Sequence, residues 1–221
     1  MKIKRVRILS ARSWQAELLM CLAGCVAASG ATARTLADQA SCGPAAAHTI
    51  AADATARIYR VLIGHSFTGP QFAYYGCAVA HTTPALLSST DAQSWVRMVE
   101  LRGVMAGFIV DQNGVDTGSN TLVVRDLTDG RVLHTASVSW MAPRTSNSLD
   151  TYVLAPSGNV AWASEHATGP TIRNEVTIRR AIGRTVRTLD RGGSIRPGSL
   201  RLLGHSIQWI DGGLRRHAPL P

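Results

Sequence analysis

The chain has 221 residues, of which 45% are hydrophobic and 17% are charged, and its formal net charge at pH 7 is +9. This length is enough for one domain with a sizeable core. No apolar run approaches the roughly 20 residues of a membrane-spanning helix, so no transmembrane helix is expected, and the sequence has neither a phosphate-cradling loop nor a nucleic-acid-binding motif.

Residues 1–33 are expected to be a signal peptide. Basic residues from Lys2 to Arg12 precede a short apolar run, Leu18 to Ala28. The small residues from Ser29 to Ala33 then provide a cleavage site after Ala33. This order of positive charge, apolar run and small residues is typical of a secretory signal.

A second interpretation of this leader stays open. Leu22-Ala23-Gly24-Cys25 resembles a bacterial lipobox, in which Cys25 would carry a lipid anchor and become the new N-terminus. The apolar run continues past Cys25 to Ala28, which favours ordinary secretion. Both interpretations predict a secreted or extracytoplasmic protein of the cell envelope.

The charge of the chain after the leader is uneven. Residues 171–221 hold ten arginines against three acidic residues, Glu175, Asp190 and Asp211. A basic end of this kind attracts anionic polymers or lipid. Most of these arginines alternate with apolar residues, however, which favours the alternative that they form the solvent-exposed face of strands.

Two cysteines, Cys42 and Cys77, follow the leader. In an exported chain a single pair of cysteines indicates one disulfide, worth about 3–4 kcal/mol by the chain-entropy estimate. The bridge would pin the segment after the cleavage site onto the first strands, with α-carbons roughly 4.4–6.8 Å apart. The alternative, two free buried thiols, is disfavoured in an oxidising compartment.

The rest of the chain divides into an arm and a domain. Residues 34–56 are rich in Ala, Ser and Gly without a clear period, and an irregular N-terminal arm is expected there. From 57 to 221, β-branched and aromatic residues alternate with short turns, which predicts strands. The clearest unit, Leu149 to Asp190, predicts four strands in succession, and Asp129-Gly130 is a hairpin signal before it.

Four sets of strands are expected to repeat this unit. Each set has a glycine between its first and second strands, at Gly64, Gly103, Gly158 and Gly204. Repeats of about 40–50 residues with four strands are typical of propeller blades. The sequence therefore predicts an all-β, propeller-like array of about four antiparallel sheets. Because the last set lacks a fourth strand, either the N-terminal segment supplies it or the ring stays incomplete and open.

Five motifs are spread over most of residues 42–220. They are Cys42-Gly43-Pro44, Tyr75-Gly76-Cys77, VVRDLTDGRVL, VLAPSGNVAWAS and the closing SIRPGSLRLLGHSIQWIDGGLRRH. Together they resemble a group of exported bacterial β-propeller-like repeat proteins of unassigned activity. The resemblance implies that fold and an extracellular location. It implies no catalytic residues, because the shared motifs are turns, an aromatic core position and a cysteine pair.

The string Asp116-Thr117-Gly118-Ser119 is similar to the active-site motif of aspartic proteases, where two such aspartates share one proton. The protease motif requires apolar strand residues directly before the aspartate. Here Asp111-Gln112-Asn113-Gly114 precedes, with Val115 as the one apolar residue between. A polar hairpin loop is therefore the favoured interpretation. The same loop carries oxygen ligands for calcium but departs from the spacing of a calcium loop, so a solvated turn is again favoured.

Two histidines and two tryptophans occupy equivalent places in the repeats. His65 and His205 follow turn glycines and could share a metal, although no zinc-site spacing is present and a hydrogen-bonded turn is the favoured role. Trp162 and Trp209 lie in the middle of second strands. They are expected to pack in the core rather than to stack on sugars.

The sequence thus favours a non-enzymatic binding or interaction module for an unknown protein or glycan, with no cofactor, metal or nucleic acid. The alternative is an extracytoplasmic hydrolase, either of glycan type or with an aspartic-protease-like site at Asp116. A deep pocket holding two or more carboxylates would favour the hydrolase. Asp111 and Asp211, each expected at the end of a second strand, are the pair to inspect.

Overall fold

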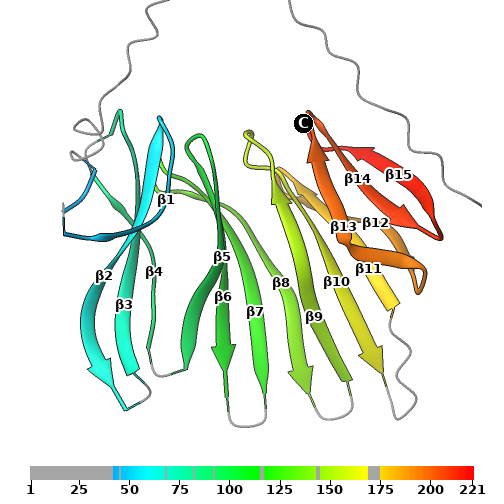
Figure 1. Cartoon of the computed structure of the whole chain (residues 1–221), viewed down its shortest axis with the longest axis horizontal. Helices are drawn as coiled ribbons and strands as arrows, with labels where there is room; N and C mark the ends of the chain where they lie inside the picture. The colour runs from blue at the N-terminus through cyan, green and yellow to red at the C-terminus, as the bar shows by residue number, and fades with distance from the viewer. Residues whose placement is uncertain are drawn as a thin grey trace, which may run out of the picture. The chain divides into compact units, whose positions relative to one another are not determined.

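The computed structural model describes residues 42–44, 46–67, 69–81, 83–91, 93–114, 117–142, 145–168 and 175–221. Every regular element in this part of the chain is a β-strand, which confirms the all-β class (Figure 1). The expected signal peptide, the cleavage site at Ala33 and the lipobox at Cys25 lie outside the described residues. No helix in the described part has the length and apolar character needed to cross a lipid bilayer.

The strands follow one another along the chain with short connections. Their bounds are β1 His48–Ala52, β2 Ala56–Ser66, β3 Gly69–Ala78, β4 Ala85–Ser89, β5 Ser94–Arg102, β6 Met105–Asn113, β7 Gly118–Asp126, β8 Val132–Ala142, β9 Thr145–Leu154, β10 Val160–Thr168, β11 Glu175–Ile182, β12 Thr185–Gly192, β13 Ile195–Leu203, β14 Ser206–Asp211 and β15 Leu214–Pro219. The four strands expected between Leu149 and Asp190 are β9 to β12.

Three antiparallel sheets result from this order. β1 to β4 form a four-stranded sheet, β5 to β12 an eight-stranded sheet, and β13 to β15 a three-stranded sheet. Within each sheet every strand pairs with its neighbour in the chain, so all connections are hairpins. None of these sheets closes on itself, and a radial propeller arrangement is not shown among the described strands.

The pairing between the two central strands of the eight-stranded sheet is short. β8 and β9 pair only at Trp140–Asn147, Met141–Ser146 and Ala142–Thr145, next to their hairpin. The rest of both strands pairs with outer neighbours instead. The sheet therefore consists of two four-stranded sets, β5–β8 and β9–β12, joined at one end. Each expected set of strands corresponds to one set in the structure.

Apolar side chains fill the space between successive sets. One cluster joins β2–β4 to β5–β7 through Ile58, Tyr74 and Phe108, with Leu87 beside them. A second cluster, around Trp162, joins β6–β8 to β9–β11. A third cluster, around Trp209, joins β10–β11 to β13–β15. In β10, Trp162 faces the second cluster, whereas its neighbours Ala161 and Ala163 face the third. Burial on both faces explains why the first half of the strand, Val160–Ala163, is continuously apolar.

The N-terminal arm differs from the expectation for residues 34–56. His48–Ala52 forms β1, which pairs with β2. The arm is therefore not wholly irregular, and this strand completes the first sheet rather than the last. The sequence left a short helix or an extended cover open here, because HTIAA is too short and too alanine-rich to carry a strand period.

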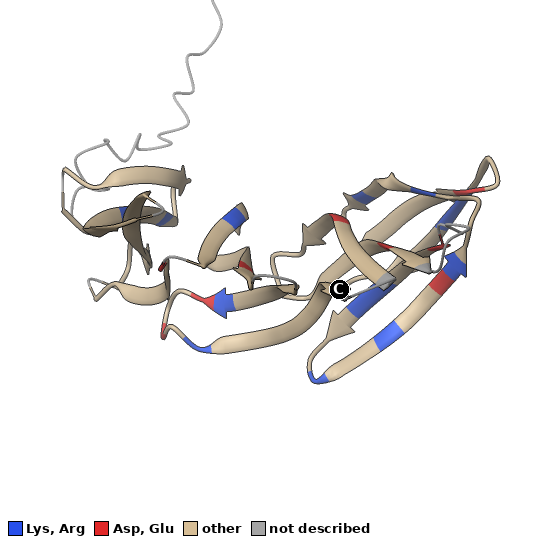
Figure 2. Ribbon diagram, turned by 90° about the horizontal axis from the view of Figure 1, so that it is seen from below, with Lys and Arg blue, Asp and Glu red and all other residues tan. Residues whose placement is uncertain are grey.

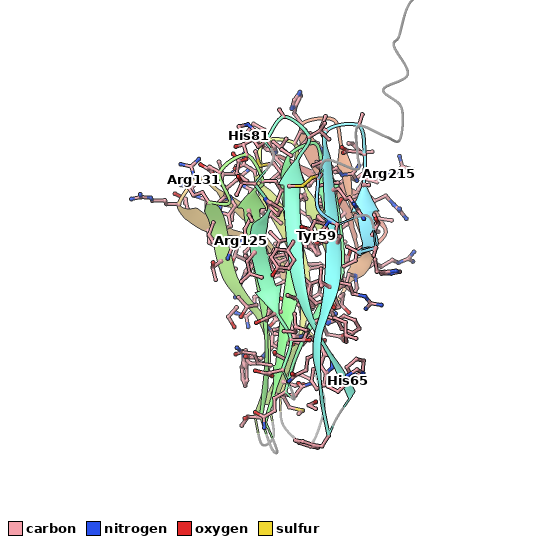
Figure 3. The ribbon with its side chains drawn as sticks, turned by 90° about the vertical axis from the view of Figure 1, so that its left-hand side faces the viewer. Tyr59, His65, His81, Arg125, Arg131 and Arg215 are labelled. Carbon is pink, nitrogen blue, oxygen red and sulfur yellow. A yellow bond between two sulfur atoms is a disulfide. The ribbon has the colours of Figure 1, made fainter. Side chains whose placement is uncertain are left out.

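The predicted disulfide is confirmed. Cys42 and Cys77 are bonded, and their α-carbons are 5.9 Å apart. Beside them Tyr59 stacks on Tyr75 with ring centroids 5.5 Å apart, and the Tyr59 ring is labelled in Figure 3. The nearly buried Arg57 donates to the Cys42 and Ala47 carbonyl oxygens at 3.3 and 3.0 Å. These contacts fix the start of the described chain to the first sheet.

Three of the four expected turn glycines lie where the repeat places them. Gly103, Gly158 and Gly204 occupy turns between the first and second strands of their sets, with positive φ. At Gly158 an added Cβ would also lie 2.5 Å from Cδ1 of Leu133. Both the positive φ and the lack of space for a side chain therefore require glycine there. Gly64 was wrongly assigned to a turn. It lies within β2, just after a bulge that interrupts the pairing with β3.

Candidate functional site

The carboxylates singled out in the sequence do not form a common pocket. Asp111 lies within β6 and its Oδ2 is 2.5 Å from Nε of Arg97. With its amide nitrogen facing Asp111, Asn120 donates to that carboxylate at 2.8 Å and accepts from Arg97 at 2.7 Å. Asp111 therefore belongs to a network of polar side chains that spans β5, β6 and β7. This role leaves it poorly suited to act as a catalytic acid.

Asp211 ends β14, as expected, and has different partners. Its Oδ1 accepts a hydrogen bond from Ser194 at 2.6 Å, and its Oδ2 lies 3.6 Å from Arg216. Asp211 lines neither the cavity near the β6–β7 hairpin nor the cleft formed by β8 to β12. The pair Asp111 and Asp211 is not brought together as the hydrolase alternative requires.

Asp116 lies outside the described residues. A cavity of about 340 Å³ is lined by the end of β6, the start of β7 and the residues before β5. Among the described residues, its lining has one carboxylate, Asp91, together with amides, hydroxyls and glycines. Hydrogen bonds from the backbone of Gln93 and from Ser94 lower the pKa of Asp91 below its ordinary value. The aspartic-protease-like site at Asp116 stays a prediction, because Asp116 lies outside the described ranges.

His65 and His205 belong to different elements. His65 is exposed in β2, and Figure 3 shows it toward the end of the strands opposite to His81. His205 lies in the β13–β14 turn of another sheet. In the described ranges, no group of three or more His, Cys, Asp or Glu residues is placed to hold a metal ion.

The expected core role of the two tryptophans is confirmed. Trp162 is 1% exposed and Trp209 is 4% exposed, and both lie in clusters between successive sets of strands. Neither ring is available for stacking on a sugar. A different tryptophan, Trp140 of β8, is 38% exposed and lies in a cleft.

This cleft opens where β8 separates from the β9–β12 set, and we refer to it as the β8–β12 cleft. Its volume is about 450 Å³, within the range of pockets that hold small ligands. All the described side chains that line it can donate or accept a hydrogen bond, and none of these is a carboxylate. They are Ser137, Trp140, Asn147, Ser164, His166, Thr177, Arg179, Thr188 and Arg191.

The strand register arranges most of these side chains in three rows across the sheet. Trp140, Asn147 and His166 form the row nearest the β8–β9 hairpin. Ser164, Thr177 and Arg191 form the middle row, and Arg179 with Thr188 forms the third. Residues directly opposite in antiparallel strands share a face of the sheet. The rows therefore line one continuous surface.

The aromatic end of the cleft is held by two contacts. The Trp140 and His166 rings are tilted by 52° with centroids 6.1 Å apart. Nδ2 of Asn147 donates to the carbonyl oxygen of Val138 at 3.0 Å, which bridges the strands where they begin to diverge. The Trp140 ring is thus placed by its neighbours while part of its surface stays exposed.

The floor of the cleft carries two hydroxyl groups that lack partners. Ser164 is 2% exposed and Thr177 is 8% exposed, and they lie directly opposite one another on β10 and β11. Neither side chain makes a hydrogen bond to any residue within the described ranges. Their hydroxyl groups are accessible from the cleft, where water or a polar ligand can hydrogen-bond to them.

Two arginines line the cleft, and their charges are balanced differently. Arg191 pairs with Glu175, with a nitrogen–oxygen distance of 2.6 Å. Arg179 lies opposite Trp162 and Thr188 and makes no ion pair or hydrogen bond in the described part of the chain. Figure 2 shows basic residues spread over the strands toward the C-terminus, in keeping with the uneven charge of the sequence.

Sequence reasoning missed this cleft. Ser164 comes two residues after Trp162 in β10, so both side chains lie on the same face of the strand. This change from an apolar to a polar side chain weakly indicates that the core ends there. Nothing in the sequence places Trp140 beside His166, because that contact depends on the β8–β9 and β9–β10 registers together.

Comparison of the chain with protein-family models, with curated proteins and with solved structures finds no match. The interpretation of the cleft therefore depends on its own chemistry.

Proposed function

We propose that this protein is an exported, non-enzymatic binding module of β-propeller-like construction that binds a glycan in the β8–β12 cleft. The observation that carries the proposal is the lining of this cleft. It combines an exposed indole ring, Trp140, with the unpartnered hydroxyls of Ser164 and Thr177. Sugars present both apolar ring faces and many hydroxyl groups, and sites for them pair an aromatic side chain with fixed hydrogen-bonding groups.

Export is supported by the leader pattern and is compatible with the Cys42–Cys77 disulfide. The propeller-like construction is supported by the repetition of meander sets with an apolar cluster between each set and the next. In this proposal each set is a blade-like repeat and the array is open.

A binding role is favoured over hydrolysis by what the cleft contains. Glycoside hydrolysis in most families uses a pair of carboxylates that flank the scissile bond. The side chains that line the β8–β12 cleft are amides, hydroxyls, rings and guanidinium groups. These groups are suited to holding a sugar chain rather than to protonating its linkage.

The test is a glycan-binding screen with protein exported into an oxidising compartment. We expect a subset of oligosaccharides to bind, and we expect Trp140→Ala to abolish that binding. Trp95→Ala is the matched control, because Trp95 is 44% exposed on β5 and does not line the cleft. Loss of binding in both variants or in neither would overturn the proposal.

The same samples should be assayed for new reducing ends. Release of reducing ends from a bound oligosaccharide would overturn the non-enzymatic assignment and support the hydrolase alternative. An unchanged oligosaccharide after prolonged incubation supports a binding module.

A further inference from the structure

We infer that the β8–β12 cleft selects an acidic saccharide, with the guanidinium group of Arg179 binding the carboxylate of a uronic acid. This inference rests on the proposed function and specifies its ligand class. The argument starts from Arg179, which lines the cleft but has no ion pair or hydrogen bond within the described ranges. Other described arginines in ion pairs are Arg97, Arg102, Arg131, Arg191 and Arg216.

The charge of Arg179 is not balanced from within the cleft. Among the described residues, no carboxylate lines this cavity. Glu175 lies on the same strand, four residues before Arg179 and on the same face, but it is engaged by Arg191 at 2.6 Å. A guanidinium group in such a place offers a planar set of donors that matches a carboxylate in two parallel hydrogen bonds.

The rows of side chains set the order of groups that a ligand must present. Along β10, the row of Trp140 and His166 is separated from the row of Arg179 by four residues, or about 13 Å at the usual rise of a strand. The unpartnered hydroxyls of Ser164 and Thr177 lie between these rows. A ligand that reaches all three rows has a ring on Trp140, hydroxyl groups in the middle and an anionic group at Arg179.

An oligosaccharide containing a uronic acid meets these requirements better than a simple anion does. A free phosphate would reach Arg179 without using the indole ring. A neutral sugar chain would use Trp140 and the hydroxyls and would leave Arg179 without a counter-charge. The combination of the three rows therefore selects a short acidic glycan.

The test compares an oligogalacturonide with its fully methyl-esterified form by calorimetric titration of the exported wild-type protein. The two probes share the same sugar rings and differ in charge. We expect the acid to bind at least about tenfold more tightly than the ester, as a charge-assisted hydrogen bond predicts. Equal affinities would overturn the inference and would leave the proposed glycan-binding function standing.

Variants then assign the preference to one side chain. Arg179→Gln should remove the tenfold preference and leave the affinity for the ester unchanged. Arg187→Gln is the matched control, because Arg187 is exposed on β12 and does not line the cleft. A preference that persists in Arg179→Gln would overturn the inference. The wild-type comparison of acid and ester gives a result even if a variant fails to fold.

Two further outcomes separate this inference from its alternatives. If neither probe binds and a broader glycan screen also fails, the proposed function falls and the inference falls with it. If an oligonucleotide binds in competition with the acidic probe and its binding is lost in Arg179→Gln, the cleft recognises a polyanion and the saccharide assignment is wrong.

Discussion

Trp209 donates a hydrogen bond from its indole nitrogen to Oδ2 of Asp190 at 2.7 Å. Trp209 belongs to β14 of the three-stranded sheet and Asp190 to β12 at the edge of the eight-stranded sheet. The bond therefore joins two sheets that also share apolar contacts around Ile178 and Ile207 and a hydrogen bond from Arg180 to the carbonyl oxygen of Pro219. Because its acceptor is a carboxylate, it is stronger than a bond between neutral groups.

Removing this bond should weaken the attachment of the last sheet. We expect Trp209→Phe to lower the free energy of unfolding by about 2 kcal/mol, from the lost charge-assisted hydrogen bond and a small loss of packing. Chemical denaturation measures the change. Trp95→Phe, at an exposed position outside this contact, should have little effect, and an equal loss in both variants would contradict the prediction.

The disulfide should stabilise the N-terminal end in particular. We expect Cys42→Ser to cost about 3 kcal/mol, as loss of a cross-link over a loop of this length predicts. Hydrogen exchange should then show early loss of protection in β1, His48–Ala52, while β9 to β12 stay protected. A uniform loss of protection over all sheets would show that the bridge stabilises the whole fold rather than its beginning.

Gly76 of β3 has no room for a side chain. An added Cβ would lie 2.6 Å from Cδ2 of Leu127 and 3.2 Å from Cδ1 of Leu87. We expect Gly76→Ala to lower the free energy of unfolding by about 1–3 kcal/mol through overpacking. In a Leu127→Ala background the same substitution should cost less, because the space has been emptied. Additive costs in the double variant would show that the two sites do not share this space.

Glu100 should make stability depend on pH. Burial raises the pKa of Glu100 above its ordinary value of 4.5, and the neighbouring Arg102 opposes part of that rise. The folded state therefore holds the proton more tightly than the unfolded state does. The free energy of unfolding contributed by this group is present below 4.5 and is lost as the pH rises through the raised pKa.

The variant Glu100→Gln removes this titration. We expect its free energy of unfolding to fall less than that of the wild type as the pH rises through this window, as measured by urea denaturation on both sides of pH 4.5. Asp129→Asn is a suitable control, because Asp129 is exposed in the β7–β8 turn. A pH profile of Glu100→Gln that matches the wild type would contradict the prediction.

The sequence by itself determined the secondary structure of this protein and much of its local detail. Alternating apolar residues and turn glycines at Gly103, Gly158 and Gly204 predicted the sets of strands, because strand period and positive φ are local properties. The pairing of Cys42 with Cys77 also followed, because these are the two cysteines after residue 33 in the sequence. Gly64 was wrongly placed in a turn because a glycine at a bulge and a glycine in a turn look the same in sequence.

The tertiary structure decided where the cleft lies and what lines it. Its three rows draw on β8, β9, β10, β11 and β12, and a shift of one residue in any register would turn its side chains to the other face. Asp111 appeared available for catalysis until Arg97 and Asn120 were seen beside it. Burial of Trp162 and exposure of Trp140 likewise depend on how one set of strands packs on the next, which is a property of non-local contacts rather than of residue type.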